Sequence, residues 1–471
     1  MKRILAGSVL LALSAAGAYG YTLSERERSY RQQIADGDAA LGRDNTFAAV
    51  ESFSGAITLK PDAMLGYLKR GETYRRRGEF VAAIRDLRRA SELDPTATRP
   101  LEELGDAYLA DTPHRYGSAA ERYEQYVRLD NNSPRVLYKL AFAKYHEGRA
   151  DAAIDAARRA LALDDKFAEA NYLLGLCYRD AQQPDAARKV LEEAVRLQPT
   201  LHHAREELAD LYGALERVDD RLNQLEVLTA LDPGPSREVA LGLAYARAGQ
   251  TDRAVTTLAR ASERYPDQRY TYVALGRVWL EIAQARSDRV ALSKAIGALE
   301  GAVGSEDSSE ALTLFGRALL MASDAETAER MLMDATARKP VEPAAFAYLA
   351  DAAERLSHFS VARQALIDYE ALRGETEPPR RAANAIRLAE LSLRMNDPAA
   401  AAAYFVRAAD GTDATLLTRA ADAQIRAGDR DAARATVVRA LEQDPNNVRA
   451  QALYRRLTVE REVPKDAKKV E

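Results

Sequence analysis

The residues of this sequence with the spacing of metal ligands lie around position 202. His202 and Glu206 are four residues apart, and so are His203 and Glu207, so a helix would place each pair on one face. Metal sites use such spacing, but they need at least three ligands that converge on the ion. We therefore predict a polar helix surface here and no metal site.

The one cysteine, Cys177, is the only thiol that could act as a nucleophile. It lies between Leu176 and Tyr178 and has no histidine near it in the sequence, so we predict that it is a small packing residue. A lone cysteine also excludes an intramolecular disulfide framework and a four-cysteine zinc site. Because no phosphate-cradling glycine loop and no pair of carboxylates stands out either, the sequence predicts no catalytic centre and no cofactor.

A third group of residues has the spacing of a binding surface for protein segments. Aromatic residues at i, i+4 and i+7 are Tyr138, Phe142 and Tyr145, and the same spacing recurs further along at Tyr172, Leu176 and Arg179. The corresponding positions on either side are acidic: Glu102 and Asp106 before, Glu206 and Asp210 after. An aromatic strip with a charged rim is typical of protein-binding sites. The alternative is that these aromatic side chains fill space between helices, as tyrosine does elsewhere in this chain.

The composition indicates helices as the elements that must position these residues. The chain has 471 residues, is rich in alanine and arginine, and contains no strand-like alternation of apolar and polar residues. Its 67 Lys and Arg nearly balance its 71 Asp and Glu. The chain therefore has no excess of positive charge that could neutralise phosphates, and we predict no nucleic-acid binding.

The clearest structural unit covers residues 238–266 and consists of two short helices joined by a turn. The first helix carries Leu241, Gly242 and Tyr245, and the second carries Ala254, Leu258 and Ala261 before Pro266. Each helix is about fourteen residues long and has one apolar stripe that it cannot bury within the pair. Stacked copies of the pair would bury it, so the unit is predicted to repeat.

The unit does repeat along the sequence, and most of its copies are spaced at a period of about 34 residues. Small residues in the middle of the first helices are Gly71, Gly105, Ala141, Gly175, Ala209, Gly242, Gly276, Gly316, Ala350, Ala389 and Ala421. The second helices carry Ala49, Ala83, Ala119, Ala153, Ala187, Ala254, Ala295, Ala328, Ala362, Ala401 and Ala433. Small residues at these places let two helices approach closely. Twelve helix pairs can be counted.

The recurring order of Leu-Gly-x-x-Tyr, alanine, an aromatic residue or leucine, alanine and proline resembles the tetratricopeptide repeat family. The resemblance covers residues 30–460. It implies an all-α fold, an α-solenoid of about twelve antiparallel helix pairs in a right-handed superhelix. It also implies a concave groove, lined mainly by first helices, that binds other proteins or peptide segments without catalysis. The family's carboxylate-binding pattern of Lys and Asn is absent between residues 102 and 210, which argues against a receptor of chaperone tails.

Departures from the repeat predict the boundaries of the domains. Residues 24–62 form an atypical N-terminal pair without the Leu-Gly motif, residues 63–371 the main array, and residues 382–445 the C-terminal pairs. Between the last two, residues 372–381 contain two prolines and predict a linker or bend. Residues 446–463 predict a capping helix, and residues 464–471 a disordered tail.

Three local departures carry further expectations. Arg221 replaces a second-helix alanine, so the sixth pair is predicted to pack more loosely. Extra residues occur at 111–117 in the third pair and at 281–289 in the eighth. The latter insertion predicts helices longer than those of the neighbouring pairs.

Residues 1–20 have the composition of a secretory signal. Lys2 and Arg3 precede an uncharged apolar stretch, residues 4–16, and residues 16–18 fit a small-x-small cleavage site. The chain would then be exported to the periplasm. An uncleaved anchor running to Leu23 is the alternative, and it would provide the only membrane contact, at the inner membrane. The repeats of an anchored chain could also face the cytoplasm, because arginines after the segment weaken the charge asymmetry across it.

Two function classes follow from these expectations. The first is an exported, non-catalytic scaffold for assembling an envelope, secretion or polysaccharide-export complex. The second is a membrane-anchored assembly factor that faces the cytoplasm. Such factors often carry a C-terminal four-cysteine zinc module, which this chain lacks. A non-catalytic subunit of a transferase is a third, weaker class.

Overall fold

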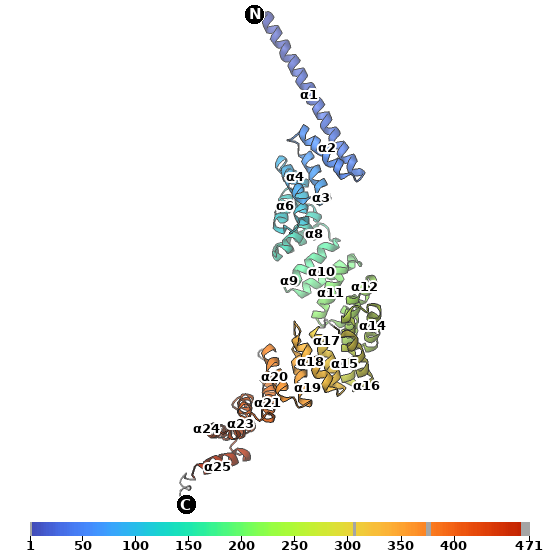
Figure 1. The fold of residues 1–471 in the computed structure, drawn as a ribbon. Coiled ribbons are helices and arrows are strands. Elements are labelled where there is room, and N and C mark those ends of the chain that lie inside the picture. Colours follow the sequence, from blue (N-terminus) through green and yellow to red (C-terminus); the bar gives the residue numbers. More distant parts are fainter. Residues whose placement is uncertain (1, 305–307, 374–377, 463–471) are drawn as a thin grey trace, which may run out of the picture. The chain divides into compact units, whose positions relative to one another are not determined.

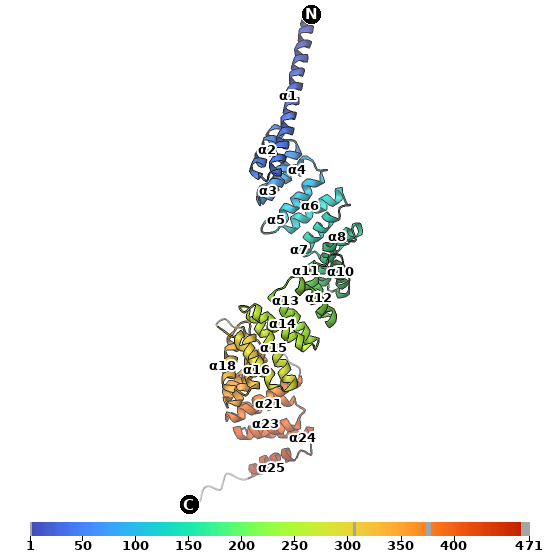
Figure 2. The same ribbon diagram turned by 90° about the vertical axis from the view of Figure 1, so that its right-hand side faces the viewer.

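The structure is a computed structural model that describes residues 2–304, 308–373 and 378–462, without the side chains of 2–20, 378–380 and 459–462. These residues form twenty-five α-helices and no strand. The first twenty-four helices form twelve consecutive pairs, and α25 follows them. The predicted α-solenoid of about twelve helix pairs is therefore confirmed. The chain divides into two compact units, unit 1 (residues 1–231) and unit 2 (residues 232–471), whose helices succeed one another in chain order (Figures 1 and 2).

Unit 1 holds six helix pairs. Its first helices are α1 (Lys2–Gly42), α3 (Met64–Arg76), α5 (Thr98–Ala110), α7 (Pro134–His146), α9 (Ala168–Asp180) and α11 (His202–Ala214). Its second helices are α2 (Thr46–Leu59), α4 (Phe80–Leu93), α6 (Tyr116–Leu129), α8 (Ala150–Leu163), α10 (Pro184–Leu197) and α12 (Val218–Leu231).

Unit 2 holds six further pairs and the last helix. Its first helices are α13 (Pro235–Arg247), α15 (Arg269–Arg286), α17 (Ser309–Met321), α19 (Ala344–Arg355), α21 (Pro378–Arg394) and α23 (Ala414–Ala427). Its second helices are α14 (Thr251–Arg264), α16 (Arg289–Ala302), α18 (Ala325–Ala337), α20 (Phe359–Arg373), α22 (Pro398–Ala409) and α24 (Arg430–Gln443), and α25 covers Val448–Glu462.

Each pair is held together along a seam between its two helices, where the small residues of the repeat meet a large apolar side chain. All eleven second-helix alanines of the repeat are 0% exposed. A Cβ atom at Gly175 would lie 2.6 Å from Leu191 in the second helix, and one at Gly71 would lie 2.7 Å from Leu87. Because no side chain fits at such a distance, the seam requires glycine in these first helices. The predicted close approach of the helices is confirmed.

The first pair, α1 and α2, has the same seam although its Leu-Gly motif is missing. Asp36 precedes the glycine, but a Cβ at Gly37 would overlap the ring of Phe53. Phe53 is fully buried together with Ala49 and Ala40. Gly37 precedes Gly71 by one period of the repeat and therefore continues the repeat by one copy.

The turn between the two helices of a pair contains a residue with positive φ in most pairs. Gly78 has a φ of 76° and Gly249 one of 73° at this place. Glycine reaches these angles without steric cost, so the pair can reverse direction within a short turn.

The departures from the repeat have different structural outcomes. α15 has 18 residues against the 13 of α13 and α17, as the extra residues predict, but α16 keeps 14. Arg221 lies over Gly213, where a Cβ would be 3.3 Å from the guanidinium. Looser packing of this pair stays a prediction.

The predicted linker at 372–381 lies inside unit 2, and residues 374–377 of it lie outside the described part. Leu388 of α21 belongs to the same hydrophobic cluster as Leu366 of α20, so apolar packing continues from one side of this segment to the other. α25 buries Leu453 and Leu457 as a capping helix would, whereas its Tyr454 is 39% exposed. Residues 464–471, the predicted tail, lie outside the described residues.

The N-terminal segment is part of α1, which runs without interruption from Lys2 to Gly42. The side chains of the predicted signal, residues 1–20, lie outside the described part of the chain. In that described part, no helix combines the length and the apolar character that a membrane crossing requires. Cleavage and anchoring stay predictions.

Candidate binding face on the first helices

The predicted aromatic strip lies on one face of α7 and α9, which contact each other. We call the row formed by the i, i+4 and i+7 positions of each first helix the first-helix face. Tyr138, Phe142 and Tyr145 occupy it on α7, and all three are half-buried. On α9, Tyr172 and Leu176 are half-buried as well, and Arg179 is exposed. The structure thus brings the six predicted residues together on two neighbouring helices.

Each aromatic side chain of the strip is partly packed and partly open to solvent. The ring of Tyr138 lies 5.0 Å from that of Phe167, measured between centroids. Phe142 lies 4.3 Å from His146 and, edge on, 6.4 Å from Tyr116. The rings are therefore held in place on one side, which lowers the entropy that a bound segment would have to remove.

Burial also changes the titration of these tyrosines. It raises the pKa of Tyr138, and the carboxylate of Glu169 adds to the effect. It raises the pKa of Tyr145 to about 12, supported by the hydrogen bond that its hydroxyl donates to Asp180 at 2.8 Å. These tyrosines stay neutral at physiological pH and offer a mixed apolar and hydrogen-bonding surface.

Arg179 connects α9 to the next first helix. Its guanidinium donates to Asp180 at 2.9 Å and to Glu207 of α11. Burial alone would lower the pKa of Arg179, but the two carboxylates outweigh burial and raise it. Arg179 therefore supplies a fixed charge at the edge of the strip and carries its own counterions.

The acidic residues before the strip have counterions within the chain, which differs from the expectation that they are available to a partner. Lys139 lies 2.7 Å from Glu102 and 2.7 Å from Asp106, and Arg135 donates to Glu102 at 2.8 Å. The hydroxyl of Tyr123 donates to Asp106 at 2.7 Å. Glu102 is only 8% exposed. These carboxylates hold α5 and α7 together and do not form an open acidic rim.

The pairing of Lys139 with Asp106 recurs along the first helices. In each case the cation lies two positions before the small seam residue of its own first helix. Its partner is a carboxylate on the preceding first helix, one position after the seam residue of that helix. The pairs are Lys69–Asp38, Lys139–Asp106, Arg387–Asp351 and Arg419–Glu390. We call this series the ion-pair ladder. Between α7 and α9 its two positions are held by Phe142 and Leu173. The ladder is not continuous, since its positions between α3 and α5 are held by two carboxylates, Glu72 and Glu103. The aromatic strip lies at one of the places without a ladder pair.

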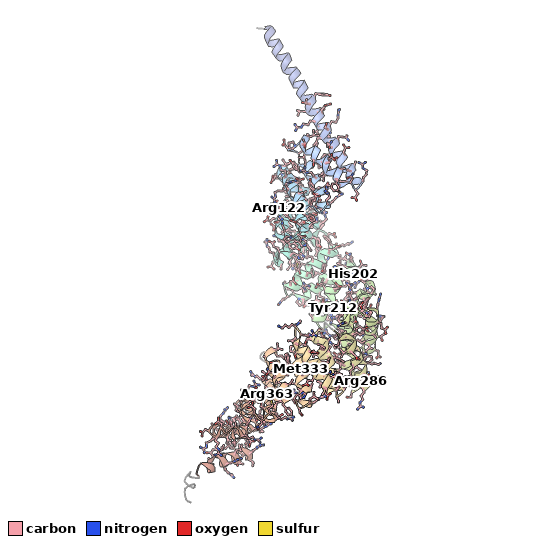
Figure 3. The ribbon with its side chains drawn as sticks, in the orientation of Figure 1. Arg122, His202, Tyr212, Arg286, Met333 and Arg363 are labelled. Carbon is pink, nitrogen blue, oxygen red and sulfur yellow. The ribbon has the colours of Figure 1, made fainter. Side chains whose placement is uncertain are left out.

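The acidic residues after the strip are more accessible. Glu206 is half-buried, with His203 at 3.5 Å, and Asp210 is exposed. Within the described part of unit 1, Asp210 has no ion pair. His202 and Tyr212 extend from the same helix, α11 (Figure 3). One open carboxylate thus remains on the side of the strip toward α11.

The side chains considered for chemistry do not form a reactive site. Cys177 is 0% exposed, and burial, with a contribution from Asp180, raises the pKa of its thiol to about 12. A thiol with this pKa is almost entirely protonated at neutral pH and is a poor nucleophile. Among the described residues, no group of three or more His, Cys, Asp or Glu side chains converges on a point that could hold a metal ion.

The corresponding face of unit 2 has a cavity that sequence reasoning did not predict. Its volume is about 340 Å³, and Val239, Leu243 and Val273 provide apolar walls. Arg277 and Glu310 form an ion pair at its edge. Apolar residues at these positions in two successive copies of the repeat are the sequence feature that could have predicted the cavity.

The ion-pair ladder also has a sequence feature that could have predicted it, because Asp106 and Lys139 are about one repeat apart.

Models of repeat families match several segments along the chain. Models described as tetratricopeptide repeat match residues 34–98, 103–166, 239–267 and 379–457. A model described as anaphase-promoting complex, cyclosome, subunit 3 matches residues 146–228. None of these models describes a catalytic domain.

Individual relatives match parts of the chain. It is 28% identical over 122 residues to small glutamine-rich tetratricopeptide repeat-containing protein 2 of Mycosarcoma maydis, which is 26% of this chain and 34% of that protein. It is 30% identical over 135 residues to human tetratricopeptide repeat protein 13, which is 29% of this chain and 15% of that protein. The chain thus spans about a third or less of these relatives. A solved structure of YrrB, described as a TPR protein with an unusual peptide-binding site, is 21% identical, with coverage of 41% of this chain and 97% of that one and a TM-score of 0.36.

Proposed function

This chain is a tetratricopeptide repeat protein, and we propose that it is a non-catalytic scaffold whose first-helix face in unit 1 binds a segment of another protein. The observation that carries the proposal is the aromatic strip on α7 and α9, where apolar residues hold the positions of the ion-pair ladder. Tyr138, Phe142 and Tyr172 are half-buried there, and no ion pair of the ladder covers the position between α7 and α9. Half-open aromatic rings on a rigid support are typical of the residues that dominate binding energy.

The charges around the strip restrict the chemistry of the partner segment. Glu102 and Asp106 are neutralised within the chain, whereas Asp210 is exposed. A segment with apolar residues at its centre and a basic residue toward α11 would complement this surface. The basic residue would mainly accelerate association, because a charge at the rim of an interface acts on encounter more than on dissociation.

The test is the triple variant Tyr138→Ala, Phe142→Ala and Tyr172→Ala. Proteins retained by the wild-type chain from an envelope extract are identified by mass spectrometry, and the affinity of the bound segment is then measured by calorimetry. We expect the triple variant to lose binding while keeping its helical circular dichroism. The control is Tyr454→Ala, which removes an exposed tyrosine of α25. A triple variant that melts early and keeps its partners would show that the rings are core, which contradicts the proposal.

We also propose that the scaffold acts in assembling a bacterial envelope, secretion or polysaccharide-export complex, exported to the periplasm or anchored in the inner membrane. The basic and apolar composition of residues 1–20 supports this proposal. Mass spectrometry of the protein from its native host should show residues 1–18 removed, or the intact chain in the membrane fraction. Full-length protein in the soluble cytoplasm would contradict both forms.

A topology reporter fused after residue 471 separates export from the alternative of an anchored assembly factor. Activity of a periplasmic reporter supports export. Activity of a cytoplasmic reporter assigns the repeats to the cytoplasmic face of the membrane.

A further inference from the structure

A cavity on α4 differs in charge from the rest of the chain. Its volume is about 610 Å³, and it is lined by α3, α4 and the residue before α6. Its lining consists of Tyr67, Arg70, Val81, Ile84, Arg85, Asp86, Arg88, Arg89, Glu92 and Arg115. Five arginines and two carboxylates therefore line one space, in a chain whose formal net charge is −4. One of the five, Arg115, pairs with Asp111 outside the lining at 2.9 Å.

The carboxylates of the lining are too few to neutralise these arginines. Asp86 is 2% exposed and is engaged by Arg70, which donates to its two oxygens at 2.6 and 3.1 Å. Arg85 lies 3.5 Å from the same carboxylate with a side chain that is 70% exposed. Arg88 donates to the neutral hydroxyl of Tyr108 at 2.9 Å and has no carboxylate within ion-pair distance among the described residues. Positive charge is therefore left over on the solvent side of the cavity.

The arginine at position 85 is not a property of the repeat. In α8, two repeats further on, the position of Arg85 is held by Asp155, whereas the positions of Arg88 and Arg89 are again arginines, Arg158 and Arg159. Arg159 lies 3.8 Å from Asp155. In α4, Arg89 has Glu92 at 3.3 Å, but no second carboxylate offsets Arg85 on the solvent side. The charge at the position of Arg85 is thus positive in α4 and negative in α8.

We propose that this cavity, the arginine cavity, binds an acidic segment of a partner protein in which an apolar side chain lies between carboxylates. Guanidinium groups bind carboxylates through two parallel hydrogen bonds, and Arg85 and Arg89 extend from α4 where such bonds can form. Val81, which is 76% exposed, and Ile84 provide the apolar contact between them. The arginine cavity shares no residue with the aromatic strip, so each of the two proposals can be tested without the other.

The shape and extent of the arginine cavity favour a protein segment over other anions. A nucleic acid would need positive charge along many repeats, but the position of Arg85 is already acidic in α8, where Asp155 holds it. The flat surface of a membrane would contact the exposed arginines and leave the concave space unfilled. A side chain from an extended segment fits into the space and brings carboxylates to its edge.

The experiment measures binding of a short labelled peptide, in which glutamates flank a leucine, to the full chain by fluorescence anisotropy. A peptide with lysines in place of the glutamates is the control. We expect the acidic peptide to bind, to weaken with added salt, and to lose at least about tenfold in affinity in the variant R85Q/R89Q. The matched variant R159Q, which changes the same position in α8, should stay within about twofold.

Several outcomes would overturn the proposal. The first is that the acidic peptide does not bind, and the second is that the lysine peptide binds as tightly as the acidic one. The third is that R85Q/R89Q and R159Q lose the same affinity for the acidic peptide. Vesicles containing anionic lipid are tested in parallel, and binding to them without binding of the peptide would assign the cavity to lipid headgroups instead. If thermal melting shows that R85Q/R89Q is destabilised, the single variant R85Q is used for the affinity measurement instead. The Arg85 side chain is 70% exposed, so its replacement should not disturb the fold.

Discussion

The seam between the helices of a pair and the first-helix face are built on the same helices but follow different rules. Along the seam, a small residue recurs in the second helix of every pair but the sixth, from Ala49 in the first to Ala433 in the twelfth, both of them 0% exposed. Along the face, ion pairs join some neighbouring helices, whereas unit 1 also carries the aromatic strip and unit 2 an apolar cavity. The seam therefore accounts for the fold, whereas differences in the first-helix face from one first helix to the next account for what the protein can bind.

The largest expected difference between the two regions concerns tyrosine. Tyr123 belongs to the seam, where it is 0% exposed below Gly105, and Tyr138 belongs to the face, where it is half-buried. Tyr123→Ala should lower the stability by about 3–5 kcal/mol, because it leaves a cavity in the core. Tyr138→Ala should cost about half of that or less, since its ring is already partly in water. Urea unfolding followed by circular dichroism measures both, and equal losses would remove the distinction between seam and face.

Overpacking is a second test of the seam. Gly175→Leu and Ala254→Leu should each cost about 1–3 kcal/mol, because both positions lie where two helices meet closely. Gly297, a glycine of α16, is the control: nothing lies within 4 Å of a Cβ placed there. Gly297→Ala should leave the stability unchanged or raise it by up to about 1 kcal/mol, as helix propensity predicts. If the thermal midpoints of both leucine variants equal that of the wild type, the seam has been placed on the wrong residues.

The ion-pair ladder provides a third test, because its members differ in burial. Lys139→Met leaves Glu102, which is 8% exposed, and Asp106 with one cation fewer and should cost about 1–3 kcal/mol. Arg419→Met removes the pair with Glu390 at the same repeat position. The two side chains are 35% and 50% exposed, so the cost should be about 0–1 kcal/mol. Chemical denaturation at low and high salt compares the variants, and a larger loss in Arg419→Met would contradict the ranking.

The smallest expected effect is at Tyr145, on the face. Tyr145→Phe removes the hydrogen bond to Asp180 and should cost about 0.5–1 kcal/mol at neutral pH. Burial and this hydrogen bond raise the pKa of Tyr145 to about 12, against about 10 in an unfolded chain. Its contribution to stability is therefore complete below pH 10 and is lost as the pH rises from 10 to 12.

The matching measurement is the thermal midpoint of wild type and Tyr145→Phe between pH 9 and 12. The difference between them should shrink as the tyrosine of the wild type ionises. A difference that stays constant over this range would show that Tyr145 titrates normally in the folded chain.

The seam was predictable from the sequence because its chemistry repeats. Glycine and alanine at the period of the repeat have one physical reason, close helix contact, and it applies in every pair except the sixth, whose second helix carries Arg221. Gly37 was missed because Asp36 replaces the leucine of the motif, although the period continues through it. The period alone is thus a better guide than the motif at the end of an array.

The face was predictable only in part. The helical spacing of Tyr138 and Phe142 placed them correctly on one side of α7. The neutralisation of Glu102 by Lys139 was not foreseen, because it joins residues 37 positions apart on different helices. The arginine cavity draws residues from three parts of the chain, and no local pattern indicates which of many arginines will share one space.

The ion-pair ladder also bears on how a chain of similar repeats finds its correct neighbours. Repeats with a common seam can stack in the wrong order or exchange between molecules at little cost in apolar contact. A cation and a carboxylate one repeat apart distinguish the true neighbour from the next repeat along. If α9 were skipped during folding, Phe142 would meet Glu207 in place of Leu173. Where ladder pairs occur, their charges thus distinguish the true neighbour, and a consensus design with the same residues in every repeat would lose this protection against misassembly.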